Sequence, residues 1–454
     1  MKKSYHVVHR ADGSWAVKAT KTGHASSIHR TQADAVQAAR PLAQQAKGEL
    51  RIHGTDNRVR ESWSYGSDVP RRMPIREDAP TSAEQSAVSV SSLAQRIGDR
   101  LRRARLMAGH SLRSLADEIN GDVSHTMLQK FEVGEVCPDT KLLARLGQAL
   151  HVRPDYFFKT DELKLETVEY RSQVKLGAKP RQRLEEQAYE FFERYLEIEN
   201  ILGLPMPEFI QADMSAFSGE GLADAIEKEA VKLRVKWELG MNPIPNVHAT
   251  LEKHGVKVRI LPHEEGFDGF SAFAKGGGVR VPVIALSERW LRGNERDLPR
   301  FRFTAIHELA HLYLILPEGL SHKEKENCCH RFAGAFLIPR KPFEQAFGVN
   351  RVKIALAELC AIKSEWGLSV AAIMARASNL GLVTAGRYKT FCIVSAKNGW
   401  RKNDPGTWIG EEESRRFKPL VLRALAQELI STSKAAGLLG ISLPELGKEF
   451  TPLD

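Results

Sequence analysis

The chain has 454 residues, a hydrophobic fraction of 42%, five cysteines and a net charge of +10 at neutral pH. That length favours about three domains, and no apolar run reaches the roughly 20 residues of a membrane span or resembles a signal-peptide core, so a cytoplasmic location without a membrane partner is expected. The odd number of cysteines argues against a disulfide framework, and the positive charge favours an acidic partner, with nucleic acid first among the candidates.

The alternation of apolar patterns predicts a multidomain α+β protein, mainly helical with small sheets. Residues 1–66 form the first predicted domain, in which Asp12-Gly13 is typical of a hairpin turn and Thr31 can cap a helix. Its predicted elements are strands at 5–9 and 15–19, a helix at 32–47 and a strand at 49–53. This small ββαβ pattern resembles the bacterial DUF2188 domain, which has no settled activity, so an accessory or partner-contact module is expected. Residues 67–91, which contain several prolines and serines, are expected to be a linker.

Residues 92–160 predict a compact unit of five short helices. The first helix is amphipathic and rich in arginine, while Ser111 and Ser124 can cap the next two helices around a turn at Gly121. This unit resembles the XRE family, the lambda-repressor type of helix-turn-helix. The resemblance implies that the helix from Ser124 enters the major groove of double-stranded operator DNA, and that the protein binds paired half-sites as a homodimer.

The resemblance also implies which side chains contact DNA. The candidates are Arg113, Ser124, His125, Thr126, Gln129 and Lys130. Serine and glutamine suit base edges, whereas Lys130 and the arginines of the first helix suit phosphates. Leu112 stands where many relatives carry a DNA-contacting glutamine, and Arg113 is the possible substitute. In the alternative interpretation the fold is an interaction module without DNA binding, and the arginine-rich helix is a solvated face.

The sequence pattern over residues 181–345 predicts helices followed by a small sheet and two further helices. The helices before the sheet are expected at 181–203 and 221–239, and the strands at 256–261, 269–274 and 279–286. A turn at Gly276-Gly277-Gly278 joins the last two strands as a hairpin, and Pro282 favours an edge position for its strand. Such an edge can bind a substrate peptide by strand addition.

The helix predicted at 303–314 contains the spacing H-E-x-x-H. His307 and His311 lie one turn apart on one face, so that both can bind one Zn²⁺ ion, and Glu308 beside them can act as general base. The rest of the helix is apolar and should lie in a core, where unpaired polar groups are costly. The pattern therefore predicts a zinc site.

A second helix ends at Pro339 and can bring an acidic third ligand to this site. Its sequence, with the H-E-x-x-H segment, resembles the ImmA/IrrE family of zinc metallopeptidases, with a zincin-like fold. The resemblance implies Zn²⁺ ligands at His307, His311 and Glu326, with Glu308 as the catalytic base. Cys329 and His330 depart from the family pattern.

Several side chains near Glu326 leave alternatives open. His330 can hydrogen-bond to a ligand or compete for the metal, and His322 and Glu324 are further rivals. Cys328 and Cys329 could bind metal, although buried apolar cysteine is the preferred interpretation. Tyr313 and His330 are candidate donors to the transition state, although a place in the core is the preferred interpretation for Tyr313.

Residues 346–454 are predicted to be mostly helical, with one short strand at 391–394. The last helices repeat a helix-turn-helix-like pattern in which Ser442 caps a helix beginning near Pro444. We expect dimerisation or internal packing from this region, with a second DNA site as the alternative.

The sequence thus favours a DNA-binding transcriptional regulator coupled to a zinc endopeptidase. A latent form of the peptidase is one of the expectations. Its expected substrate is a partner protein, a repressor or antitoxin, cleaved after a stress, phage or mobile-element signal. One alternative is a protease toxin or phage-defence effector held inactive by a neighbouring protein. The other is a non-enzymatic transcription factor that uses the peptidase fold as a sensor, which the intact Glu308 disfavours.

Overall fold

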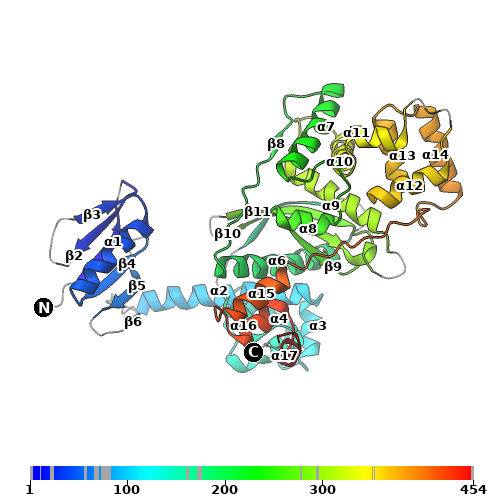
Figure 1. Cartoon of the computed structure of the whole chain (residues 1–454). Helices are drawn as coiled ribbons and strands as arrows, with labels where there is room; N and C mark the ends of the chain where they lie inside the picture. Colours follow the sequence, from blue (N-terminus) through cyan, green and yellow to red (C-terminus); the bar gives the residue numbers. More distant parts are fainter. Residues whose placement is uncertain are drawn as a thin grey trace. The chain divides into compact units, whose positions relative to one another are not determined.

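The structure is a computed structural model of a multidomain, mostly helical chain with small mixed sheets (Figure 1). It describes residues 4–10, 12–20, 25–55, 59–65, 71–72, 83–159, 163–170, 176–276, 279–292, 296–349, 351 and 353–450. The chain divides into two compact units, Met1–Ala87 and Val88–Asp454, each described by itself below. Within the described ranges, no helix is both long and apolar enough to cross a bilayer.

The first unit is a six-stranded sheet with one helix packed on it. Its elements are β1 (Ser4–His9), β2 (Trp15–Ala19), β3 (Ala25–His29), α1 (Gln32–Gln45), β4 (Glu49–His53), β5 (Val59–Ser64) and β6 (Arg71–Arg72), in the sheet order β3-β2-β1-β4-β5-β6. The predicted ββαβ elements are confirmed, including the cap from Thr31, whose side chain accepts from the Asp34 amide. The sheet is larger than predicted because β3 and β5 are short and largely polar, which hides the strand pattern.

The described parts of the predicted linker belong to regular elements. β6 lies within it, and α2 (Ala83–Met107) begins well before the expected start of the next domain. The cause is that alanine, glutamate and glutamine at its start favour helix and extend the amphipathic helix backwards. Residues 67–70 and 73–82 lie outside the described residues.

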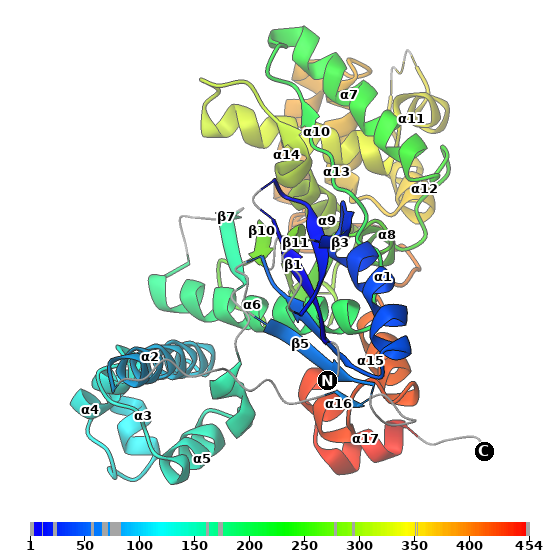
Figure 2. The same cartoon turned by 90° about the vertical axis from the view of Figure 1, so that its left-hand side faces the viewer.

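The second unit begins with the five predicted short helices (Figure 2). After α2 come α3 (Leu112–Glu118), α4 (His125–Glu132), α5 (Thr140–Ala149) and the 3₁₀ helix η1 (Pro154–Phe158). Ser111 and Ser124 cap α3 and α4 as predicted, and Asp139 caps α5. Their apolar faces enclose one core that includes Leu101, Leu128 and other buried side chains.

A four-stranded sheet organises the rest of this unit. Its strands are β7 (Lys164–Tyr170), β9 (Lys257–Leu261), β10 (Gly269–Gly276) and β11 (Val279–Ser287), in the order β7-β10-β11-β9. β10 and β11 form the predicted antiparallel hairpin, whose turn lies partly outside the described residues. β7 was not predicted and pairs antiparallel with β10.

The edge position predicted for the strand of Pro282 is wrong, since β11 lies inside the sheet between β10 and β9. Pro282 pairs with Phe273 of β10, whereas the pairing with β9 begins only at Val283. The missing N–H of proline is tolerated because the ladder to β9 does not require a donor there.

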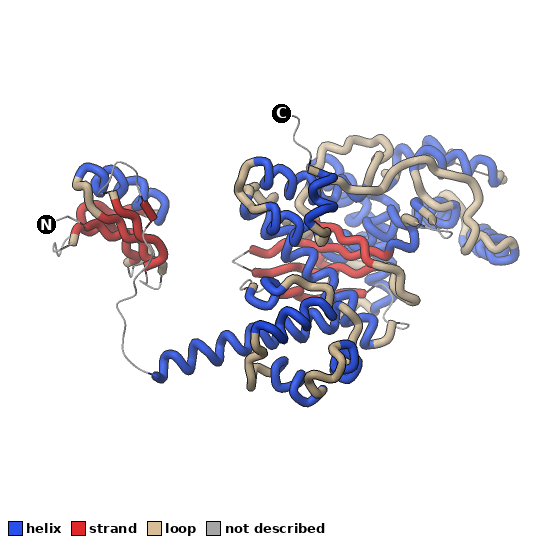
Figure 3. The backbone as a smooth tube through the Cα atoms, turned by 90° about the horizontal axis from the view of Figure 1, so that it is seen from below, coloured by secondary structure: helices blue, strands red, loops and turns tan. Residues whose placement is uncertain are grey.

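Helices cover both faces of this sheet (Figure 3). Alternate strand residues enter two separate cores: Ile284 packs with α7, α9 and α10, whereas Ala285 packs with α6 and the C-terminal helices. The helices and short elements are α6 (Ala178–Ile201), β8 (Ala212–Asp213), α7 (Gly219–Lys236), α8 (Val247–Lys253), η2 (Glu288–Trp290), α9 (Leu298–Tyr313), β12 (Leu314–Ile315), α10 (His322–Leu337) and α11 (Arg340–Phe347).

The C-terminal region is helical as predicted, with one correction. It comprises α12 (Leu356–Trp366), α13 (Val370–Asn379), α14 (Ala385–Lys397), α15 (Phe417–Ala426), α16 (Thr432–Leu439) and α17 (Leu443–Glu449). The strand predicted at 391–394 is wrong because it lies inside α14, which Thr384 caps. Its β-branched and aromatic residues resemble a strand only when the segment is considered without its cap. Ser442 caps α17 as predicted, and buried residues of α15–α17 pack in the core of α6.

Candidate metal centre and DNA-contact surface

The metal site depends first on α9, a helix buried on almost every face. The Asp297 side chain accepts from the Arg300 amide at its N-terminus, and Pro299 occupies its first turn. Both groups suit the start of a helix, where the first amides have no partner within the helix. His307 and Glu308 are each 0% exposed, so α9 carries these polar groups into the core.

α10 supplies the third side chain. Ser321 and Glu324 form a capping box at its start, in which each side chain bonds the other residue's backbone amide. This cap fixes the first turn, and Glu326 follows at the start of the second turn, beside α9. Glu324, considered above as a rival ligand, is thus engaged in the cap at 2.8 Å from the Ser321 amide.

His307, His311 and Glu326 converge on one point. The Nε2 atoms of the two histidines lie 3.1 Å apart. Each lies 3.2 Å from a different carboxylate oxygen of Glu326. Zinc about 2.0–2.1 Å from each of three tetrahedral ligands would hold them roughly 3.3 Å apart. These residues therefore fit one ion. Among the described residues, they form the group of His, Cys, Asp or Glu side chains whose ligand atoms are close enough together to hold a metal.

The electrostatics of Glu326 also suit a ligand. Burial alone would raise the pKa of its carboxyl, but the hydrogen bonds with His307 and His311 outweigh burial and hold that pKa well below its usual range. The group is therefore an anion at neutral pH, as a metal ligand must be.

The departures from the family pattern lie beside the cluster rather than within it. Cys329 is buried, with its Sγ 3.6 Å from Nδ1 of His311, and burial raises the pKa of its thiol. Cys329 is not part of the group with metal spacing, and its thiol lies close enough to Nδ1 to hold the imidazole of His311 in one orientation. The His330 ring lies 4.5 Å from the ring of His307, between centroids.

The sequence did not reveal Ser271 as a functional residue. Ser271 lies on β10 and is 1% exposed, and its Oγ donates a 3.0 Å hydrogen bond to Oε2 of Glu308. A Cβ on Gly269 would lie 3.5 Å from Cγ of Glu308, so β10 runs directly against this carboxylate. The available signal was a single hydroxyl in the buried apolar part of the strand, where it requires a partner.

Tyr313 does not serve the cluster. Its hydroxyl donates to Oε1 of Glu229 at 2.7 Å, and burial raises the pKa of the phenol. The tyrosine therefore connects α9 to α7, which is a structural role.

The candidate DNA contacts form an exposed surface on α3 and α4. The exposed side chains are Arg113, Ser124, His125, Thr126, Gln129 and Lys130. Leu128 and Phe131 of the same helix are buried, so α4 presents its polar face to solvent. Ser124 serves mainly as a cap, since its Oγ accepts from the Met127 amide at 3.2 Å.

The arginines of α2 are only partly available to phosphates, contrary to the sequence-based interpretation. Arg105 forms a two-point ion pair with Glu132, at 2.5 and 2.7 Å. Arg100 pairs with Glu193 of α6, and Arg103 lies 3.9 Å over the ring of Tyr189. Regular helical spacing cannot distinguish these buried pairs from a solvated face, because their partners are distant in the sequence.

The fold and the site define a class: a helix-turn-helix domain joined to a metallopeptidase-like domain with a His/His/Glu cluster. Residues 251–378 match the family of the IrrE N-terminal-like domain, peptidase M78. Residues 101–157 match a helix-turn-helix family, and residues 5–65 match DUF2188, an uncharacterised family conserved in bacteria. No curated protein matches the chain. The chain therefore contains these three domains, which confirms the resemblances noted in its sequence.

Proposed function

We propose that this protein is a DNA-binding transcriptional regulator coupled to a zinc-dependent endopeptidase, whose substrate is a partner repressor or antitoxin. The observation that carries the proposal is the cluster of His307, His311 and Glu326 at 3.1–3.2 Å, with the buried Glu308 next to it in the helix. A family of peptidases matches this part of the chain, which supports the same chemistry.

In this proposal His307, His311 and Glu326 hold Zn²⁺. When bound, the ion supplies Lewis-acid chemistry: it acidifies water and polarises a peptide carbonyl. Glu308 accepts the proton that the attacking water loses and later donates it to the leaving amine. The hydrogen bond from Ser271 keeps the Glu308 carboxylate in one orientation, so that it is ready for both transfers.

The DNA-binding half of the proposal is supported by the polar face of α4. Gln129 and Thr126 can reach base edges while Lys130 neutralises a phosphate. Helix-turn-helix proteins bind paired half-sites, and a homodimer of this chain would present two copies of α4. Binding at its own promoter, or recognition of a repressor with the same fold, would bring the peptidase to its substrate.

β7 supports a latent form of the enzyme. A peptide can bind a protease by adding a strand to the sheet edge beside the catalytic groups. β10 carries Ser271, which contacts Glu308, and its outer edge is paired with β7, where Glu169 stands opposite Ser271. A segment of the chain itself thus takes the place of such a peptide. The same feature suits the second candidate, a protease effector released by a signal.

The first experiment is zinc analysis of the purified protein. About one zinc per chain is expected, with loss of the metal in His307→Ala and Glu326→Ala. Glu308→Gln should keep the metal and lose proteolysis. The loss would be detected by comparing newly formed protein N-termini between cells that express the wild type and cells that express Glu308→Gln. Zinc that survives Glu326→Ala would refute the ligand set, and identical N-termini in both cells under every inducing condition would refute the peptidase.

A further inference from the structure

A second candidate site lies at the N-terminal end of α9, away from the His/His/Glu cluster. A pocket of about 740 Å³ opens between η2, the start of α9, α12 and the loop at 401–408. Its size is in the range of small-molecule sites, but its lining is unusually charged. The described lining includes six basic side chains, Arg289, Arg296, Arg300, Lys363, Arg401 and Lys402, and two acidic ones, Asp297 and Asp404.

Both acidic side chains are already engaged by the protein. Asp404 accepts from Nζ of Lys363 at 2.6 Å and from the Val370 amide, while Asp297 caps α9 through the Arg300 amide. The pairing of Asp404 with Lys363 therefore offsets one of the six cations. The described lining has four more basic than acidic side chains, and Asp268 offsets one of them through its ion pair with Arg300. The net positive charge that remains favours an anion.

Two of the arginines are held in place by an aromatic ring. Trp290 is buried, and its indole lies 3.8 Å from the guanidinium carbon of Arg300 and 4.7 Å from that of Arg289, measured to the ring centroid. The Nε1 group of Trp290 donates to Asp268 at 3.2 Å, which fixes the ring. Arg300 also donates to the other carboxylate oxygen of Asp268 at 3.4 Å, so Trp290 and Asp268 together hold Arg300 in position, while Trp290 stacks on Arg289.

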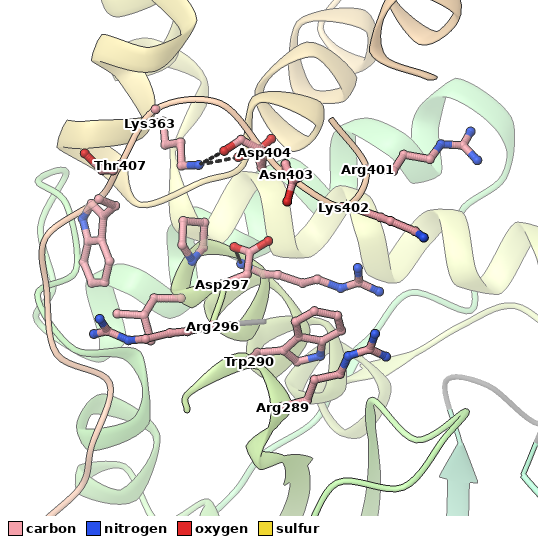
Figure 4. A pocket seen from close by; sticks show the side chains of 15 residues that line it. Arg289, Trp290, Arg296, Asp297, Lys363, Arg401, Lys402, Asn403, Asp404 and Thr407 are labelled. Carbon is pink, nitrogen blue, oxygen red and sulfur yellow. Dashed lines mark hydrogen bonds and ion pairs between the residues drawn. The ribbon is translucent and has the colours of Figure 1, made fainter. Parts of the chain in front are cut away.

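The remaining cations come from a distant part of the chain. In the view of Figure 4, the head groups of Arg401 and Lys402 lie on the same side of the pocket as that of Arg289, while Lys363 and Asp404 face each other elsewhere. Both Arg401 and Lys402 are exposed, and the described residues offer neither of them an ion-pair partner. Basic side chains from two segments, the η2–α9 part of the chain and the loop at 401–408, thus line the same pocket.

We propose that this pocket binds a small ligand carrying two or more phosphate groups. Guanidinium and ammonium groups both bind phosphate, and more than one phosphate is needed to reach the cations of both segments. A small ligand is favoured over the DNA backbone because the charges line a pocket, whereas the expected DNA-contact surface lies on α3 and α4.

The position of the pocket gives binding a consequence for the metal site. Arg300 is in the first turn of α9, and His307 follows about two turns later in the same helix. The loop that carries Arg401 continues to Glu412, whose buried carboxylate pairs with Arg302 of α9. A bound ligand would therefore tie this loop to the catalytic helix. This consequence rests on the proposed peptidase function, whereas the binding itself does not.

The test is calorimetric titration of the full-length protein with inorganic tripolyphosphate, with sodium sulfate at matched ionic strength as the comparison. Saturable binding at one site per chain is expected, and the double variant Arg401→Gln/Lys402→Gln should bind about ten-fold more weakly or worse. The control Lys389→Gln/Lys397→Gln removes the same charge from the exposed face of α14 and should bind as the wild type does.

Thermal unfolding of each variant checks that the fold is kept. Arg296→Gln is a second pocket variant, and it should also weaken the binding of tripolyphosphate. Equal weakening in the two double variants, or sulfate binding as tight as that of tripolyphosphate, would overturn the proposal in favour of general charge attraction. Loss of duplex DNA binding in the pocket variant, with tripolyphosphate binding unchanged, would assign the cations to the DNA backbone. None of these results depends on cleavage, so the proposed peptidase function is tested separately.

Discussion

The contact between the helix-turn-helix and α6 can be broken by one substitution, Glu193→Gln. Arg100 of α2 is 5% exposed and Glu193 of α6 is 4% exposed, and their two hydrogen bonds measure 2.5 and 2.8 Å. Removal of one partner from a buried pair costs about 3–5 kcal/mol, because the remaining charge stays buried without compensation. Glu190 lies 4.0 Å from Arg100 and offers partial compensation, so the lower end, about 3 kcal/mol, is expected.

Hydrogen exchange followed by mass spectrometry is the suitable assay, because a multidomain chain has no single free energy of unfolding. Opening that becomes easier by about 3 kcal/mol should speed exchange in the core amides of α2–α5 by roughly a hundred-fold. Glu197→Gln is the matched control on α6, since Glu197 pairs with the partly exposed Lys434, and about 1 kcal/mol or less is expected there. Equal exchange in the two variants would refute the assigned role of the buried pair.

The same contact should be sensitive to acid. Burial tends to raise the pKa of Glu193, but hydrogen bonds from Arg100 and Lys159 outweigh burial and lower it from its ordinary value of 4.5. A carboxyl with a lowered pKa in the folded state contributes stability that is present above its unfolded pKa and lost as pH falls through the folded pKa. Protection of α2–α5 should therefore decline below about pH 4.5 in the wild type, and Glu193→Gln should lack this component.

Three further predictions concern the site, the sheet edge and the DNA surface. Ser271→Ala should leave zinc content unchanged and lower kcat about ten-fold with little change in KM, measured on the substrate found from new N-termini; loss of zinc instead would mean a collapsed site. Leu165→Pro in β7 removes an N–H opposite Ala274 of β10 and should speed amide exchange in β10 and raise proteolysis, whereas Leu165→Ala should do neither. Lys130→Ala should weaken DNA binding for all sequences and reduce the salt slope by about 1, while Gln129→Ala should relax base preference by about 1–3 kcal/mol; the reverse pattern would contradict the contact assignment.

The features that the sequence predicted well are those written in local patterns. The H-E-x-x-H spacing depends only on helical geometry, and the caps at Ser111, Ser124 and Ser442 lie beside the amides that they bond. The approach of Glu326 to the two histidines required the family pattern as well. Its position on α10 follows from the helix, but the angle between α9 and α10 is set by packing across the whole core.

The errors arise where distant partners decide the outcome. The pairing of β7 with β10 joins segments about a hundred residues apart, so no local pattern announces it. Pro282 was assigned to an edge because its N–H is missing. The sequence does not show that β9 pairs with β11 only from Val283 onward, so that no donor is needed at Pro282. The arginines of α2 look solvated until α6 and α4 bring Glu193 and Glu132 to them.

The helix-turn-helix and the metal-binding domain share α6, and this argues against two independent modules. Glu193 of α6 holds Arg100 on the DNA-binding side, while Glu199, further along the same helix, pairs with the buried Lys257 of β9 at 2.7 Å. The chain between η1 and α6 contains β7, the strand that covers β10 beside Glu308 and Ser271. Since β7 follows η1 and precedes α6 in the chain, we expect a shift of the helix-turn-helix on α6 to affect the position of β7. DNA binding and access to the edge of β10 are thus expected to change together. Breaking the Arg100–Glu193 pair should therefore alter both DNA binding and access to this edge.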